Sequence, residues 1–277
     1  MFAGKKRQLE KKKPGKQKQP LIPKLRSVSL RLIAIFAIAQ AIALFAGAQF
    51  IAQRVSVVQD SASVANSAFL FAYVIGATLL MLVLIKYYKG SKLFLLFEYL
   101  LIFSTVELFA AMFVGELLAL TAAALVVSVR FALPRARNAS LVLAIAVVGG
   151  LLGASLDLLP AAVFAGALAC YDVIAVFYSG HMVTLAKALS KRGAAFAVHL
   201  RDGKESIQLG TGDVVIPGML SVSAAKIAPA AGAFGLLGSL LGLIAIIVVL
   251  EKFKGYWPAL PPIVFGTLGA IGLFIAM

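Results

Sequence analysis

The chain has 277 residues, 62% of them hydrophobic, and its mean hydropathy is +1.00. Soluble domains are only about 45 to 50% apolar, so this composition excludes a soluble globular protein and indicates a multi-pass membrane protein. The formal net charge of +15 does not indicate nucleic-acid binding, because the surplus of Lys and Arg lies mainly in residues 1–31.

The chain begins with a basic segment, residues 1–29, which prolines at positions 14, 20 and 23 interrupt. It is too polar to pack, and we predict a cytoplasmic tail beside anionic lipid headgroups. No small-residue cleavage site follows the first apolar run, so we expect that run to remain in the membrane as a span. A single cysteine, Cys170, excludes an intrachain disulfide.

The apolar stretches divide into nine segments of the length that a membrane crossing needs, about 20 residues each. A turn near Gly115-Glu116 separates the third from the fourth. With the N-terminus in the cytoplasm, every Lys and Arg except Arg54 and Lys226 falls on the inner side, which places the C-terminus outside. The predicted spans are 30–53, 65–85, 93–110, 113–131, 139–156, 160–179, 207–225, 230–250 and 258–277.

The longest internal connection, 180–206, is polar enough to leave the hydrocarbon. Residues 181–189 are amphipathic and are expected to lie along the membrane surface. Asp202-Gly203 favours a tight turn, so we predict a short β-hairpin before span seven, with an irregular loop as the alternative. An open edge of such a hairpin could pair with an unwound substrate by strand addition.

Two carboxylates, Asp172 and Asp213, lie inside apolar runs. An ionisable group at membrane depth costs at least ~2.5 kcal/mol, so it persists mainly where it faces a polar cavity and has a function. The two carboxylates can meet only if helix six ends near Ser179-Gly180, which places each about seven residues inside its span. We therefore predict a helix break at that point.

Paired carboxylates in a low dielectric cannot readily both ionise, so they share one proton. The ionised member can then activate water and the protonated member can donate to a peptide carbonyl, as in an aspartic protease. Gly210 and Gly212 allow a backbone to approach Asp213, and Pro217-Gly218 can loosen the helix beyond it. One alternative is a pair of buried helix-packing acids. Another is a proton-coupled transporter or ion-leak channel that uses Asp172 and Asp213 as a relay.

Three short motifs follow one another in the second half of the chain: Tyr171-Asp172, Gly210-Thr211-Gly212-Asp213 and Pro258-Ala259-Leu260. They resemble the motifs of the presenilin and signal peptide peptidase family of intramembrane aspartyl proteases, most closely its archaeal single-chain members. The resemblance implies that Asp172 and Asp213 are catalytic, and that the other residues of the three motifs shape the active site and bind substrate. It also implies cleavage of transmembrane segments or signal peptides within the bilayer. Thr211 stands where the family often has a larger apolar residue, which affects the expected substrate preference.

The resemblance also sets the expected organisation. Residues 1–29 form the tail, 30–156 a scaffold of five helices, and 157–277 the catalytic part with helices six to nine. We expect an all-α polytopic protein in the cell membrane that needs no metal and no cofactor. No long hydrophilic insertion of the kind that presenilins carry for autoproteolysis is present, so obligate subunits are not expected, and a homo-oligomer is compatible with the sequence. Prepilin peptidases share Gly-x-Gly-Asp but lack the Pro-Ala-Leu element.

Other polar residues are weaker candidates for an active site. Glu98 could join the cavity, but an interhelical hydrogen bond is the favoured interpretation. Neither a zinc site around His181 and His199 nor a serine protease site in Ser179-Gly180-His181 has suitable spacing. For the prolines at 258, 261 and 262 the alternatives are a cavity wall and a proline-rich helix start. Outer-boundary acids (Glu107, Glu116, Asp157) are expected to be solvated, and glycines 235, 238 and 242 to serve close helix packing.

Overall fold

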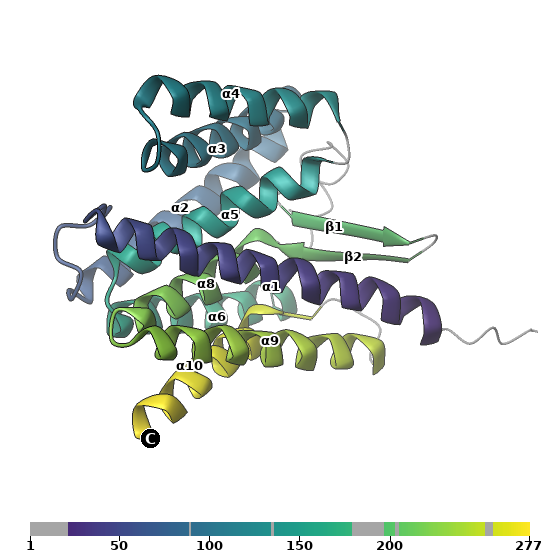
Figure 1. The fold of residues 1–277 in the computed structure, drawn as a ribbon. Coiled ribbons are helices and arrows are strands. Elements are labelled where there is room, and N and C mark those ends of the chain that lie inside the picture. Colours follow the sequence, from purple (N-terminus) through teal and green to yellow (C-terminus); the bar gives the residue numbers. More distant parts are fainter. Residues whose placement is uncertain (1–21, 89, 134–135, 179–196, 203–204, 253–256) are drawn as a thin grey trace, which may run out of the picture.

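The computed structural model describes residues 22–88, 90–133, 136–178, 197–202, 205–252 and 257–277. Within these ranges the chain forms nine helices and one β-hairpin, which Figure 1 shows. The all-α prediction with a hairpin before the seventh predicted span is therefore confirmed. The part of the basic tail before residue 22 and the amphipathic segment 181–189 lie outside the described residues. The helices are α1 (Ile22–Ala52), α2 (Ala65–Tyr87), α3 (Lys92–Ala111), α4 (Glu116–Ala132), α5 (Ala136–Ser155), α6 (Leu158–Phe177), α8 (Thr211–Ala225), α9 (Pro229–Lys252) and α10 (Leu260–Ala276).

Six of these helices are long and apolar enough to cross a membrane, namely α1, α2, α3, α5, α6 and α9. The apolar helices α8 and α10 are shorter, and α4 has 17 residues. At 1.5 Å per residue, α8 is roughly 22 Å long, less than the ~30 Å hydrocarbon core. A multi-pass membrane protein is therefore confirmed, and its seventh predicted span is a short helix.

Two helix starts differ from the prediction by four residues or more. Helix α1 begins at Ile22 rather than at residue 30, so the end of the predicted tail is helical. Pro23 does not prevent this, because proline is tolerated in the first turn of a helix, where its missing N–H has no helical partner. Helix α8 begins at Thr211 rather than at residue 207. The predicted turn near Gly115 is present, and Gly115 is the N-cap of α4.

The hairpin explains the late start of α8. Strand β1 (Ala197–Asp202) pairs antiparallel with β2 (Glu205–Gly210), with Val198 opposite Leu209. These two side chains are buried in a core cluster that includes residues of α1 and α5. Because side chains alternate between the faces of a strand, β2 buries Leu209 without helical periodicity. The apolar residues before Thr211 therefore belong to a strand and not to the membrane helix.

Helix α8 lies between two buried clusters. Val214 packs into the first cluster, with side chains of α1, α5, α9 and the hairpin. Ile216 packs into the second, with side chains of α6, α9 and α10. Figure 1 shows α8 between α1 and α6 and the hairpin beside α1. The α3–α4 pair lies at the top of the view. The two clusters together hold the start of α8 in the middle of the bundle.

The α3–α4 pair contains a buried ion pair. Glu98 of α3 accepts a hydrogen bond from Arg130 of α4, and both side chains are almost fully buried. Arg130 also donates to the hydroxyl of Ser140 at 2.8 Å and to the carbonyl of Arg137, both on α5. The interhelical interpretation of Glu98 is therefore confirmed, and its partners belong to the α3–α4–α5 corner of the fold.

Candidate active site

Three helices bring the three sequence motifs together. Asp172 lies near the C-terminal end of α6, Asp213 in the first turn of α8, and Leu260 is the first residue of α10. Helices α6, α8 and α10 contact one another pairwise. The sequence motifs, distant along the chain, thus meet at one place in the fold.

Asp172 is partly buried, and its carboxylate contacts the start of α10. Its Oδ2 accepts a hydrogen bond from the backbone N–H of Leu260, with an N···O distance of 3.3 Å. The first N–H groups of a helix have no partner within the helix, so this donor is available to an outside acceptor. A helix N-terminus also favours a negative charge. The Pro-Ala-Leu segment therefore contacts the acid of the Tyr-Asp motif directly.

Asp213 occupies a different helix N-terminus, that of α8. Gly210 is the N-cap residue, and its backbone N–H donates to Asp213 Oδ2 at 3.2 Å. This is the backbone half of a capping box, in which an acidic side chain reaches back to the N-cap. Asp213 is thus two residues into a helix and not about seven residues into a span, because the residues before Thr211 are extended strand.

The contact between α6 and α8 brings Asp172 and Asp213 to the same part of the fold. This arrangement requires α6 to end soon after Asp172. Helix α6 ends at Phe177, with Tyr178 as its C-cap. The end lies just ahead of the predicted break at Ser179-Gly180, and those two residues themselves lie outside the described part of the chain.

The two glycines before Asp213 have different surroundings. A Cβ atom built at Gly212 would meet no atom within 4 Å, whereas one built at Gly210 would lie 3.0 Å from Asp213 Oδ2. Gly212 is exposed, so a backbone can approach α8 there. Gly210 instead leaves room for the Asp213 carboxylate to reach its own N-cap.

Tyr171 and Thr211 border the two acids. The ring of Tyr171 packs edge-on against Phe71 of α2, with ring centroids 6.3 Å apart and an interplanar angle of 88°. Its hydroxyl also interacts with Thr78 of α2. Thr211 is the partly buried first residue of α8. The sequence analysis did not identify Phe71 or Thr78, because no motif marks them.

The prolines at 258, 261 and 262 were expected to form either a cavity wall or a proline-rich helix start, and the three differ in position. Pro258 is buried and precedes the helix, and Ala259 is the N-cap residue, which packs against the first core cluster. Pro261-Pro262 stand in the first turn of α10, where a missing N–H has no structural consequence, so they fit a helix start. Trp257, just before the motif, packs edge-on against Phe177 at the end of α6, with centroids 5.7 Å apart.

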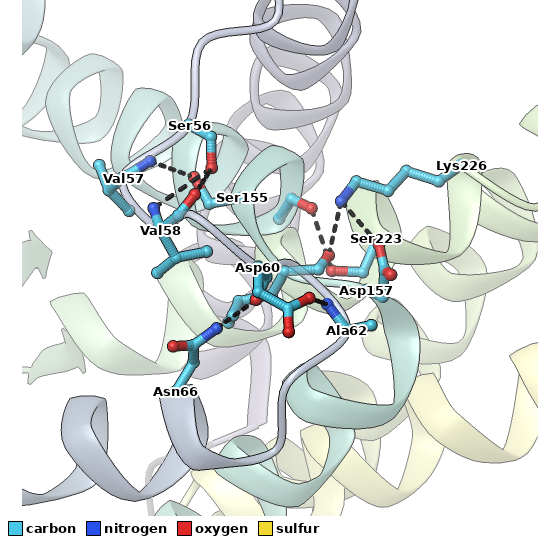
Figure 2. A network of polar contacts seen from close by, with 12 residues as sticks. Ser56, Val57, Val58, Asp60, Ala62, Asn66, Ser155, Asp157, Ser223 and Lys226 are labelled. Atoms are coloured by element: carbon cyan, nitrogen blue, oxygen red, sulfur yellow. Dashed lines mark hydrogen bonds and ion pairs between the residues drawn. The ribbon is translucent and has the colours of Figure 1, made fainter.

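The outer-boundary acid Asp157 lies at the other end of α6, away from Asp172. Its Oδ1 pairs with Lys226 Nζ at 3.1 Å, and 44% of its side chain is exposed. Figure 2 shows this pair within a polar network that joins the α1–α2 loop, the α5–α6 junction and the end of α8. The expectation that Asp157 is solvated is therefore met only in part: its side chain is partly exposed, and it also forms an ion pair.

One further polar residue near the site was missed. Gln40 of α1 is fully buried, and its Nε2 donates to the carbonyl oxygen of Val214, the residue after Asp213, at 2.9 Å. The only signal in the sequence is a single amide within an apolar span. Such an amide is expected to find a partner between helices, but the sequence does not show which one.

Comparison with known proteins identifies one matching family. Residues 33–195 match the family model described as signal-peptide peptidase, presenilin aspartyl protease. This match includes Asp172 and ends before Asp213. No curated protein matches the chain.

Two solved structures, each described as a presenilin family intramembrane aspartate protease, share the fold. The first, in space group C222, gives a TM-score of 0.66 at 23% identity over 88% of this chain and 95% of that chain. The second, in space group P2, gives a TM-score of 0.64 at 25% identity over 93% and 98%. Because the family match covers more than half of the chain, it favours a protease over the alternative of a proton-coupled transporter. The chain therefore belongs to the signal peptide peptidase and presenilin family and is an intramembrane aspartyl protease.

Proposed function

We propose that Asp172 and Asp213 are the catalytic pair of this protease. The observation that carries the proposal is their placement on two contacting helices, each carboxylate beside the N-terminus of a helix. The backbone N–H groups of Leu260 and Gly210 each contact one carboxylate, so neither acid depends on a side chain for its orientation.

The chemistry needs one proton between the two carboxylates, because two charges in a low dielectric repel each other. The ionised carboxylate accepts a proton from water as the water oxygen attacks the scissile carbonyl carbon. The protonated carboxylate donates to the carbonyl oxygen, which gives a neutral tetrahedral diol. The carboxyl group that took the water proton then donates it to the amide nitrogen, while the other carboxylate accepts a proton from a diol hydroxyl. The C–N bond breaks, and the pair again holds one proton. No covalent bond to the enzyme forms.

The remaining motif residues bind and orient the substrate. Gly212 faces open space beside Asp213, so the substrate backbone can approach there. Thr211, at the start of α8, and Tyr171, beside Asp172, border the same region. The segment Pro258 to Leu260 shapes the side formed by α10, where Leu260 holds Asp172. Gly210 acts through Asp213, whose carboxylate it orients.

The substrate is a transmembrane segment or a signal peptide whose helix unwinds locally. A fully hydrogen-bonded helix shields its carbonyl carbons, so unwinding must precede attack. Strand β2 pairs with β1 along one edge and runs directly into the turn that carries Asp213. The other edge of β2 has no strand partner among the described residues, so an unwound segment can add there and be led to the two acids.

The setting of the enzyme follows from charge and helix order. We place it in the cell membrane with the basic N-terminal tail on the cytoplasmic side, beside anionic lipids. Residues 30–156 form the scaffold and residues 157–277 the catalytic part. The two parts are not separate, because α1 and α5 of the scaffold contact α8 directly. The chain works uncut and without obligate subunits.

The test is cleavage of a labelled single-span substrate by purified protein in lipid vesicles. Asp172→Asn and Asp213→Asn keep the shape of each side chain but cannot act as base or acid. We expect each to lose at least about 100-fold in rate, the lower range for general acid–base catalysis. Asp157→Asn is the matched control, because it makes the same change at the other end of α6.

The same vesicles separate the outcomes. Normal cleavage by either active-site variant would exclude that carboxylate from the reaction. Proton flux without cleavage by the unmodified chain would favour the relay alternative. A comparable loss in the Asp157→Asn control would show that the change disturbs the fold rather than the chemistry.

A further inference from the structure

A buried amide on α1 reaches the turn of α8 that carries Asp213. Gln40 lies within the apolar helix α1, and none of its surface is exposed. Its Nε2 donates to the carbonyl oxygen of Val214 at 2.9 Å, a contact between residues 174 positions apart in the chain. This is a direct hydrogen bond from the scaffold to the residue after Asp213.

The amide is only partly satisfied. Gln40 Oε1 is buried and has no hydrogen-bond partner among the described residues. A buried acceptor without a partner lowers stability, and an apolar side chain of similar shape avoids this penalty. Packing alone therefore favours a side chain such as methionine at position 40, and the amide needs another explanation.

The turn that Gln40 contacts has a weakened backbone. In an α-helix, each carbonyl accepts from the N–H four residues later. For the carbonyl of Asp213 that residue is Pro217, which has no N–H. The first turn of α8 thus lacks a helical hydrogen bond at the residue that carries the carboxylate. Gln40 supplies a donor from outside the helix to the next carbonyl along the chain.

Close packing of three helices keeps this donor in place. A Cβ atom built at Gly218 of α8 would lie 3.1 Å from Ala43 Cβ and 3.4 Å from Gln40 Oε1, both on α1. One built at Gly149 of α5 would lie 2.9 Å from the carbonyl oxygen of Val215. The backbones of α1, α5 and α8 therefore approach closely beside the contact, which leaves the Gln40 side chain little freedom to move.

We infer that Gln40 is a positioning residue for catalysis: its amide fixes the first turn of α8 and thereby the position of Asp213. The inference rests on the proposed catalytic role of Asp213. It explains why a half-paired amide lies in the centre of an apolar helix, and it assigns a catalytic contribution to a scaffold helix that carries none of the three sequence motifs.

Gln40→Met tests the inference, because it keeps the approximate volume and removes the donor. We expect the melting temperature to stay the same or rise, since an unpaired acceptor disappears. The value of kcat should fall roughly 10- to 100-fold, as expected when a reacting group is slightly misplaced. KM for a single-span substrate should change less than about twofold, because Gln40 does not contact substrate in this scheme.

Inhibitor binding gives a second measurement. A peptide analogue with a hydroxyl group in place of the scissile carbonyl resembles the tetrahedral intermediate and needs both carboxylates in position. Its affinity should fall with kcat in Gln40→Met, since transition-state analogues follow transition-state stabilisation. A loss of packing that leaves Asp213 in place would not lower kcat and inhibitor affinity together.

The control is Gln53→Met, at the residue that follows the C-terminal end of α1. Gln53 also donates its Nε2 to a backbone carbonyl on another segment, that of Met112, at 3.1 Å. This contact is exposed and lies just beyond the end of α1, away from α8, so kcat should not change. The control removes the same kind of hydrogen bond from the same stretch of chain without touching α8.

Each outcome decides the inference. Unchanged kcat in Gln40→Met overturns it, and so does a large fall in melting temperature, which would make Gln40 a structural residue. If Gln40→Met does not fold, Gln40→Leu replaces it, and failure of both variants also overturns the inference. Full cleavage by Asp213→Asn would refute the proposed function itself. An inactive Asp213→Asn beside a normal Gln40→Met would refute only the role of Gln40.

Discussion

The two helices that carry the acids differ in how firmly the fold holds them. Ten of the 15 residues of α8 are buried, against seven of the 20 in α6. Helix α8 contacts α1, α5, α6, α9 and α10, whereas α6 contacts α2, α8 and α10. Asp213 is therefore attached to the centre of the bundle, and Asp172 to a helix nearer its surface.

The difference is greatest beside Asp172 itself. Ile174, Phe177 and Tyr178, which follow it, are 53%, 54% and 85% exposed. Within the part of the chain that the structure describes, the end of α6 is held by the packing of Phe177 against Trp257 and by the hydrogen bond from the Leu260 N–H to the Asp172 carboxylate. A protease that admits a helix from the side needs part of its site to yield. We infer that the yielding part is α6, while α8 stays fixed.

At the outer ends the two helices are tied together. Lys226, at the C-terminal end of α8, pairs with Asp157, the N-cap of α6, and donates to the carbonyl of Leu156 at 3.0 Å. The backbone N–H of Asp157 donates to the carbonyl of Ser61 at 2.9 Å. Figure 2 shows the side chains of this network. The arrangement suits a motion of α6 that pivots near this network and is largest near Asp172.

Among changes outside the two acids, the largest effect is expected from displacing the start of α10, which donates a hydrogen bond to Asp172. At Gly242 of α9, an added Cβ would lie 2.4 Å from the carbonyl oxygen of Pro262 and 2.6 Å from Ile263 Cα. Gly242→Ala should push α10 away and move the Leu260 N–H from Asp172. We expect unfolding to become easier by about 1 to 3 kcal/mol and cleavage to slow at least about 10-fold.

Gly269→Ala is the control for this change, because a Cβ there meets no atom within 4 Å. Alanine in place of a helical glycine should leave cleavage unchanged and stabilise slightly, by about 0.4 to 1 kcal/mol. Thermal unfolding in detergent and initial cleavage rates measure both effects. Equal activity in the two variants would show that the contact between α9 and α10 does not control Asp172.

A smaller effect is expected on the firmly held side. Gly210→Ala brings a Cβ to about 3.0 Å from Asp213 Oδ2 and should disturb the contact with the Gly210 N–H. Because a helix cap is worth about 1 kcal/mol, we expect kcat to fall roughly fivefold. The buried remainder of α8 should hold the carboxylate near its place.

Gly212→Ala provides the contrast. Its Cβ would face open space next to Asp213 and would not crowd the carboxylate. If substrate backbone approaches there, KM should rise while kcat changes little. Steady-state rates over a range of substrate densities in the vesicles separate the two parameters. The same response in both variants would contradict the different roles assigned to the two glycines.

Much of this architecture could be predicted from the sequence. The lengths of the apolar runs, the basic residues between them and Asp202-Gly203 predicted the helices and the hairpin, and three short motifs predicted which segments meet. The start of α8 could not be predicted, because apolar residues such as Leu209 fit a buried strand as well as a span. The hydrogen bonds of Gln40 and Leu260 depend on tertiary contacts across 174 and 88 positions, which no local pattern encodes.

The smallest effect is expected where both helices are tied by several contacts at once. Lys226→Met removes the ion pair with Asp157, which is partly exposed and worth at most about 1 kcal/mol. The hydrogen bonds from Asp157 N–H to Ser61 and from Ser223 to Gly153 remain. Cleavage should therefore stay within about twofold, since a change of about 0.4 kcal/mol or less in the barrier corresponds to that factor.

Lys252→Met controls for the lost charge. Lys252 is an exposed lysine of α9 with no ion pair among the described residues. A large loss of cleavage in Lys226→Met alone would show that the Lys226–Asp157 contact determines how Asp172 and Asp213 are positioned. That result would contradict the view that α6 only pivots at this end.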